Sequence, residues 1–206
     1  MDLNDCLFST KFRQLAPKKD LVEQYLFGLQ KRYTEPHRTY HNGQHIEDGL
    51  KRYFDLFDTM EPHAFYAWAY HDAVYDPLAK DNEERSAHLL YDEVTKLGLT
   101  ALQREWAVDM VLATKLNSAH STVVNDMDLS VFGGDIPVYL KYVKEIRAEY
   151  AAIPDKTFNA GRLHVLQILQ QRKPFFHTSE FYAAYEIQAG LNMASEIRAL
   201  SEAVKQ

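Results

Sequence analysis

The sequence predicts an all-α protein that folds as a single domain. Along most of the chain, apolar residues recur every three or four positions, which is the period of helices that bury one face. No stretch combines two-residue alternation with an excess of β-branched residues, as strands do. The chain has 206 residues, 46% of them hydrophobic, which is enough for one substantial core. We therefore expect one helical domain over residues 1–206, with its core at about residues 20–200.

Charge and cysteine content narrow the classes of partner. The formal net charge is −6, and no block of like charges is present, which argues against nonspecific binding to a nucleic acid polymer or to a membrane surface. No apolar run approaches the length that spans a bilayer. Cys6 is the only cysteine, which excludes an internal disulfide and fits a reducing compartment. We expect a cytoplasmic protein.

The first two helices follow from apolar spacing and a proline. The spacing predicts a helix over 20–33 with Asp20 as its N-cap, and Pro36 lies beyond its end. A second helix is expected to begin near Tyr40. If it does, His41 and His45 stand one turn apart on the same side and can reach one site.

The most unusual stretch is the pair His71-Asp72, which follows the apolar run 64–69. Pro62 is expected in the first turn of the helix that delivers this pair. An imidazole and a carboxylate are costly to bury without a partner, and a divalent cation satisfies both. The competing interpretation is that the pair ends a helix and faces water, which is the more frequent case for an arbitrary His-Asp pair.

Capping patterns predict the later helices. We expect helix starts at Asp81, Thr100, Asp135, Thr157 and either Thr178 or Ser179. Gly98 is expected to end the first of these helices. In the second, one face carries Leu102, Trp106, Met110 and Ala113. In the last helix we expect the inward residues to be Ala184, Ile187, Leu191, Ala194 and Ile197.

Four blocks of the chain resemble the motifs of a known family. These blocks are 38–46 (RTYHNGQHI), 71–76 (HDAVYD), 82–87 (NEERSA) and 126–133 (DMDLSVFG). Their order resembles the signature of the HD superfamily of metal-dependent phosphohydrolases, in particular its branch of predicted metal-dependent phosphohydrolases. The resemblance covers roughly residues 20–200.

The resemblance implies an HD-type helical bundle with a metal site in its core. It implies as metal ligands His45, His71, Asp72 and Asp128, joined in a two-metal centre by His41 and His120. His41 has an alternative role in supporting a ligand or touching phosphate, and a simple loop histidine is the plain alternative for both. Asp126 is the alternative to Asp128 as a metal ligand, and if it is not a ligand it is expected to cap a helix. One or two divalent ions are expected, drawn from Mn, Co, Ni, Mg, Zn and Fe.

The implied activity is hydrolysis of a phosphomonoester or phosphodiester by metal-activated water. The substrate would be a small phosphorylated metabolite or nucleotide. The expected catalytic residues are Asp72, Asp76 and Glu84, with Glu83 an equal reserve to Glu84. The expected substrate-binding residues are Arg38, His41, Lys80 and Arg85, with Lys115 beside them.

Two other functions fit the same resemblance. Some HD-fold proteins hold two irons and oxidise small molecules with oxygen, and His41 and His120 keep that alternative open. The other alternative is a nucleotide-binding module without turnover. Exposed aromatic residues on the later helices are compatible with a homodimer.

Overall fold

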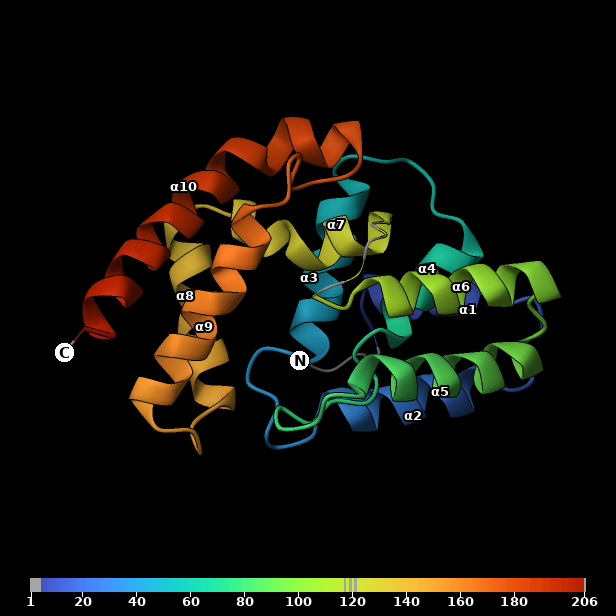
Figure 1. Ribbon diagram of the computed structural model, residues 1–206. Coiled ribbons are helices and arrows are strands. Elements are labelled where there is room, and N and C mark those ends of the chain that lie inside the picture. Colours follow the sequence, from blue (N-terminus) through green and yellow to red (C-terminus); the bar gives the residue numbers. More distant parts are fainter. Residues whose placement is uncertain (1–4, 117, 119, 121, 206) are drawn as a thin grey trace. The chain divides into compact units, whose positions relative to one another are not determined.

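The structure, a computed structural model of the chain, describes residues 5–116, 118, 120 and 122–205 (Figure 1). Across these residues it contains ten α-helices, one 3-10 helix and no strand, which confirms the all-α prediction. The chain divides into two compact units, of which the first ends at Met127 and the second begins at Asp128. This boundary falls inside helix α7 (Val123–Leu129), and the expectation of a single domain stays a prediction.

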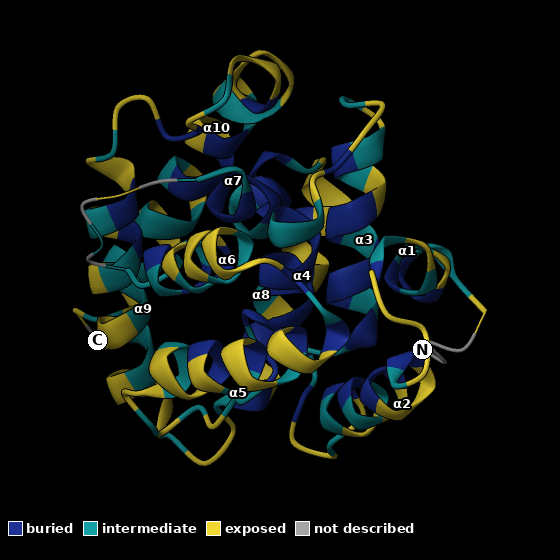
Figure 2. Cartoon of the chain, turned by 90° about the vertical axis from the view of Figure 1, so that its right-hand side faces the viewer, coloured by how far each residue is buried: buried dark blue, intermediate teal, exposed yellow. Residues whose placement is uncertain are grey.

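Helix α4 is the centre of the first unit. The other helices of this unit are α1 (Leu7–Leu15), α2 (Val22–Tyr33), α3 (Gly43–Phe54), α5 (Asn82–Leu97) and α6 (Ala101–Ala113). Helix α4 (Pro62–Tyr70) packs against α1, α5 and α6, and α1 also packs against α2 and α3. Every residue of α4 from Ala64 to Tyr70 is buried, as the dark blue of α4 shows (Figure 2).

Buried polar atoms of this core donate hydrogen bonds to the backbone. The Tyr33 hydroxyl donates to a carbonyl of α4 at 3.0 Å, and the Tyr66 hydroxyl donates to one of α1 at 3.2 Å. The Trp68 indole donates to a carbonyl of α3 at 3.0 Å. These bonds satisfy the polar atoms of three buried aromatic side chains and tie α4 to three neighbours at once.

Several predicted helix ends are confirmed. Pro62 occupies the first turn of α4, where its missing N–H leaves no hydrogen bond unmade. Gly98 ends α5 with φ of 89°, a left-handed conformation that glycine adopts at little cost. Thr100 and Gln103 form the expected capping box of α6.

Three predicted helix starts are wrong. Leu21, not Asp20, is the N-cap of α2, and Pro154 precedes the ninth helix in place of Thr157. Helix α3 begins at Gly43, because the Asn42 side chain accepts a hydrogen bond from the Gln44 amide at 2.8 Å and caps the helix there. His41 consequently precedes this helix and is not on its first turn.

The second unit contains a buried charged network. Its elements are η1 (Ser130–Gly133), α8 (Ile136–Glu149), α9 (Asp155–Gln170) and α10 (Ser179–Ala203), and η1 packs against α8 and α10. The Arg162 guanidinium donates to both oxygens of Glu196, at 2.9 and 3.1 Å, and to the Tyr142 hydroxyl at 2.9 Å. The two ionised side chains are each 9% exposed, so burial is offset by direct pairing.

The predicted inward face of α10 is wrong. Ile187 is 82% exposed and Leu191 is 61% exposed, whereas the buried residues of this helix are Phe181, Ala189, Asn192 and Met193. Apolar residues lie on more than one side of α10, so spacing alone does not identify the covered side. The same applies to α6, in which Leu102 and Trp106 are exposed. None of the helices in the described ranges has the length and apolar character needed to cross a membrane.

We predict that Gly49→Ala destabilises the protein by about 1–3 kcal/mol, the usual cost of overpacking a core. A methyl group added at Gly49 would lie 2.2 Å from the Trp68 ring. The matched control is Gly28→Ala in α2, where an added methyl group meets nothing within 4 Å. This control should be neutral or stabilising by up to about 1 kcal/mol. Chemical denaturation measures the free energy of unfolding of both variants. Equal changes in the two would contradict the close approach of Gly49 to the Trp68 ring.

Candidate metal centre

Three of the predicted ligands come from α3 and from the end of α4. His45 is in the first turn of α3 and is 5% exposed. His71 is the C-cap residue of α4 and is 1% exposed, and Asp72 follows it. Because α4 is buried along its length, its last turn carries the imidazole and the carboxylate to the inside of the first unit.

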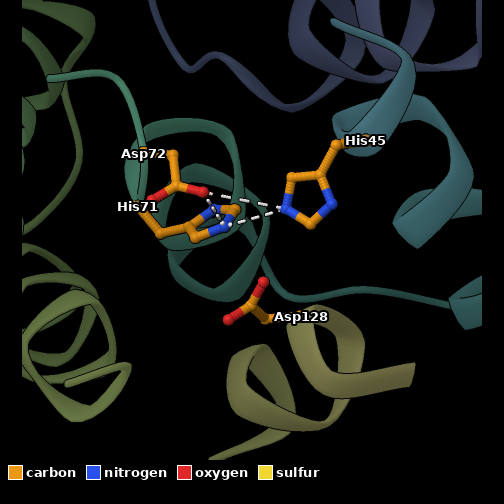
Figure 3. A group of neighbouring side chains, drawn as sticks. All are labelled: His45, His71, Asp72 and Asp128. Carbon is orange, nitrogen blue, oxygen red and sulfur yellow. Dashed lines mark hydrogen bonds and ion pairs between the residues drawn. The ribbon is translucent and has the colours of Figure 1, made fainter. Parts of the chain in front are cut away.

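These three side chains converge on one point. The Nε2 atom of His71 lies 3.2 Å from Nε2 of His45 and 3.0 Å from Oδ2 of Asp72. His45 Nε2 and Asp72 Oδ2 are 3.8 Å apart. With one carboxylate oxygen of Asp128, the four donor atoms lie within 4.8 Å of one another (Figure 3). The His45, His71, Asp72 and Asp128 cluster can therefore hold a metal ion.

Asp128 is carried by helix α7, whose start is hydrogen-bonded to the end of α6. The Asn125 side chain donates to the carbonyl of Ala113 at 2.7 Å and accepts from the amide of Thr122 at 2.8 Å. These bonds fix the start of α7 to the end of α6. Asp128 follows Met127 in the same helix and is the first residue of the second unit.

The hydrogen bond of the His71 ring selects the atom that faces the cluster. Its Nδ1 lies 2.8 Å from the carbonyl of Trp68, which can only accept, so Nδ1 carries a proton. In the neutral ring, Nε2 then presents a lone pair toward an Asp72 oxygen 3.0 Å away. Two acceptors at that distance require a proton or a cation between them, which is the arrangement of a histidine ligand with its second nitrogen tied to the backbone.

The donor set suits a divalent ion of the first transition row. Such ions bind imidazole nitrogen and carboxylate oxygen at about 2.0–2.2 Å, so two ligands of one ion lie at most about 4.2 Å apart. The spread of 4.8 Å is slightly wider, and closure by a few tenths of an ångström would complete the shell. Two imidazoles and two carboxylates do not distinguish among these metals.

Aromatic side chains surround the two histidines. The His71 ring stacks on Trp68 with centroids 4.4 Å apart, and the His45 ring lies 5.1 Å from the same indole. Tyr40 lies 4.8 Å from His45 on another side. The two imidazole rings are therefore packed among aromatic side chains next to the carboxylate of Asp72.

Arg38 is used to position the backbone next to the ligands. Its guanidinium is fully buried and donates to the carbonyls of Asp72 at 2.7 Å, Ala73 at 3.2 Å and His41 at 3.0 Å. A further N–H donates to Glu35 at 2.9 Å. The guanidinium therefore holds the loop that carries His41 against the turn that carries Asp72, and its predicted contact with phosphate stays a prediction.

The other two predicted histidine ligands are not members of the cluster. The His41 ring stacks on Tyr75 with centroids 4.2 Å apart, and its centroid is 5.9 Å from that of His45. His120 is exposed. Of the two rival aspartates, Asp128 joins the cluster, whereas Asp126 is fully buried in α7 and is not a member.

The predicted rim residues are exposed. Asp76 accepts from the Leu78 amide at 2.9 Å, Arg85 lies 3.8 Å from Asp81, and Lys80 is exposed. Glu84 is also exposed and pairs with Lys115. The catalytic and substrate-binding roles of these residues stay predictions.

The pKa values of two further residues are influenced by carboxylates of the cluster. Burial, and then the negative charge of Asp72, raise the pKa of Glu83. Burial lowers the pKa of Arg172, and the charge of Asp128 opposes that change. Arg172 lines an open cavity of about 1120 Å³ in the second unit, together with Phe175, Phe176, Tyr182 and Met193. Glu83 lies in the motif block 82–87, but nothing in the sequence around Arg172 singles that residue out.

Comparison with known proteins finds no matching family model, no matching curated protein and no matching solved structure. The chemistry of the centre is accordingly argued from its donor atoms and their surroundings. The decisive property is that two imidazole nitrogens and two carboxylate oxygens lie within 4.8 Å of one another, close to the span of one coordination shell.

We predict that Mn²⁺, Co²⁺, Ni²⁺ or Zn²⁺ stabilises the protein and that Asp72→Asn abolishes the effect. At a free metal concentration 100 times the dissociation constant, binding contributes about 2.7 kcal/mol, which raises Tm by about 5–10 °C in a chain of this size. Differential scanning fluorimetry and elemental analysis measure both. The control is His88→Asn, which removes an exposed histidine near a carboxylate of α5. Equal metal retention in wild type and Asp72→Asn would refute the centre.

We predict opposite effects of Glu83→Gln and Glu84→Gln on the stability of metal-free protein. The pKa of Glu83 is raised, so its ionisation costs stability as pH rises above about 4.3, its unfolded value. Glu83→Gln should therefore raise Tm at pH 7 and change it little near pH 4. The Lys115 partner lowers the pKa of Glu84, whose contribution is present at pH 7 and is lost as pH falls through the folded pKa. Glu84→Gln should slightly lower Tm at pH 7. If the two variants change Tm at pH 7 in the same direction, the surroundings described for Glu83 and Glu84 are wrong.

Proposed function

We propose that this protein is a metal-dependent phosphohydrolase that cleaves a phosphomonoester or phosphodiester of a small metabolite. The observation that carries the proposal is the convergence of His45, His71, Asp72 and Asp128. These are the residues that the resemblance to the HD superfamily implies as ligands. Hydrolytic centres of this type need a Lewis-acid ion held by neutral imidazoles and carboxylates, and this donor set supplies both.

The residues around the centre have distinct parts in the proposed reaction. A bound divalent ion supplies Lewis acidity, which makes water a nucleophile at neutral pH and polarises a phosphoryl oxygen. The Trp68 carbonyl holds the His71 tautomer, and Arg38 holds the backbone of Asp72. Both contacts orient ligands before substrate arrives, which lowers the cost of organising the site.

Glu83 is the proposed proton carrier. It is half-buried, its pKa is raised, and the charge of Asp72 acts on it. A carboxyl group with a raised pKa keeps a proton closer to neutral pH and can give it to a leaving alkoxide. Exposed Glu84, whose pKa is lowered by Lys115, is less suited to that task.

Arg172 is the proposed phosphate contact. It belongs to the same unit as Asp128 and is influenced by that carboxylate. It also lines a cavity of the second unit that has aromatic and apolar side chains. Lys173 and His177 line the same cavity and add positive or titratable donors.

The oxygenase alternative depends on a second metal ion held by His41 and His120. Within the described ranges, the cluster of metal-binding groups includes neither residue, so no observation favours a two-iron centre over hydrolysis. The hydrolase proposal needs only the four clustered ligands. Elemental analysis of aerobically purified protein separates the two: two irons per chain without phosphatase activity would favour oxidation.

We predict metal-dependent hydrolysis of p-nitrophenyl phosphate or bis(p-nitrophenyl) phosphate, measured by release of nitrophenolate. Asp72→Asn should lower kcat/KM at least about 100-fold, because it removes a ligand of the ion that activates water. His88→Asn should retain the wild-type rate. Turnover in Asp72→Asn equal to wild type would overturn the proposal.

The role of Arg172 is tested in the same assay. Arg172→Gln should raise KM and leave the metal content unchanged, because the side chain is proposed to contact phosphate and is not a ligand. The control is Arg13→Gln, which alters an exposed arginine of α1 that pairs with Glu23. If both arginine variants behave like wild type, the phosphate contact lies elsewhere, whereas the metal centre itself is judged by Asp72→Asn alone.

A further inference from the structure

Helix α10 exposes an apolar stripe in the middle of its length. Ile187 and Leu191 are one turn apart and are 82% and 61% exposed. Further exposed residues recur along this helix on both sides of these two. Exposed leucine and isoleucine at helical spacing on a 25-residue helix form a face that another helix can cover.

Small residues flank this stripe. Ala184 and Gly190 are exposed, and Ala194 is half-buried. A methyl group added at Gly190 would meet nothing within 4 Å, so the surface beside Leu191 is open. Helix axes approach most closely where the contact residues are small, and larger residues on either side then interlock.

The stripe ends in opposite charges. Glu180 and Arg198 are both exposed and lie about five helical turns apart, which places them on the same side of the helix as Ile187 and Leu191. Among the described residues, Arg198 has no ion-pair partner. A carboxylate and a guanidinium thus mark the two ends of one apolar face.

The order of these residues is self-complementary about Ala189. Ile187 and Leu191 are each two positions from Ala189, Ala184 and Ala194 are each five, and Glu180 and Arg198 are each nine. When two copies of the helix lie antiparallel about a twofold axis at this level, Ile187 of one copy faces Leu191 of the other. Each Glu180 then faces an Arg198, and the alanines face each other. A twofold interface needs this pairing of a surface with itself, and an unrelated partner does not.

We propose that this face of α10 is a homodimer interface, in which two copies of the helix pack antiparallel about a twofold axis at the level of Ala189. The occupant is a second copy of this chain, because the charges and apolar residues complement themselves in that one register. The contact would extend over roughly 27 Å of helix between Glu180 and Arg198. The proposal is independent of the proposed hydrolysis.

Sedimentation equilibrium of the full chain tests the proposal. Wild type should be dimeric at micromolar concentration, and Ile187→Asp or Leu191→Asp should raise the dimer dissociation constant at least about 100-fold. The matched control is Leu102→Asp, which alters a leucine of α6 with 52% exposure and should leave the dimer intact. Circular dichroism establishes that each variant is folded. A monomeric wild type, or a dimer insensitive to both α10 substitutions, would overturn the proposal.

A charge-swap cycle tests the antiparallel register. Glu180→Arg alone and Arg198→Glu alone each place like charges together at both ends and should weaken the dimer several-fold. The double variant E180R/R198E regenerates opposite pairs and should return the dissociation constant to near the wild-type value. Raising the salt concentration should reduce these differences, because the pairs are exposed. If the double variant is as weak as the single variants or weaker, the two helices do not pack in this register.

Discussion

The hydrogen bond from the His71 ring to the Trp68 carbonyl is the contact on which the centre depends. It is made within the last turn of α4, so its geometry follows from the helix itself. It also sets the tautomer and directs Nε2 toward His45 and Asp72. The burial of α4 therefore has two consequences. Its aromatic residues build the core of the first unit, and its C-terminus places an imidazole in a buried position.

Polar groups inside each unit are paired closely. Arg38 uses its buried donors on the backbone around the ligands, and Arg162 pairs with Glu196 and Tyr142 in the second unit. Breaking such a buried pair costs several kcal/mol because it leaves one charge without a partner. The cluster differs, since the unprotonated Nε2 of His71 faces an oxygen of Asp72 at 3.0 Å and neither atom has a hydrogen to donate. This contrast distinguishes a ligand set from a structural ion pair.

The second unit exposes apolar residues of α10, although it encloses the ionised pair Arg162 and Glu196. Ile187 and Leu191 are exposed on α10, whereas Asn192 on the same helix is buried and donates to the carbonyls of Phe132 and Gly134. An amide can be buried there because both of its amide donors are satisfied, and the apolar side chains are left for an external contact. The distribution fits a helix with one face covered by its own unit and another by a second copy.

The sequence by itself determined the helical class and the helix ends at Pro62, Gly98 and Thr100, because each rests on a local pattern. The motifs behind the resemblance also named the four residues of the cluster, but they named His41 and His120 with them. The sequence did not determine which side of α10 is buried, since apolar spacing shows what shares a face and not what covers it. Nor did it reveal that the Arg38 side chain is buried, or that the carboxylates of Asp72 and Asp128 influence the pKa values of Glu83 and Arg172. Those properties depend on residues brought together from distant parts of the chain, and only the tertiary structure decides which of them meet.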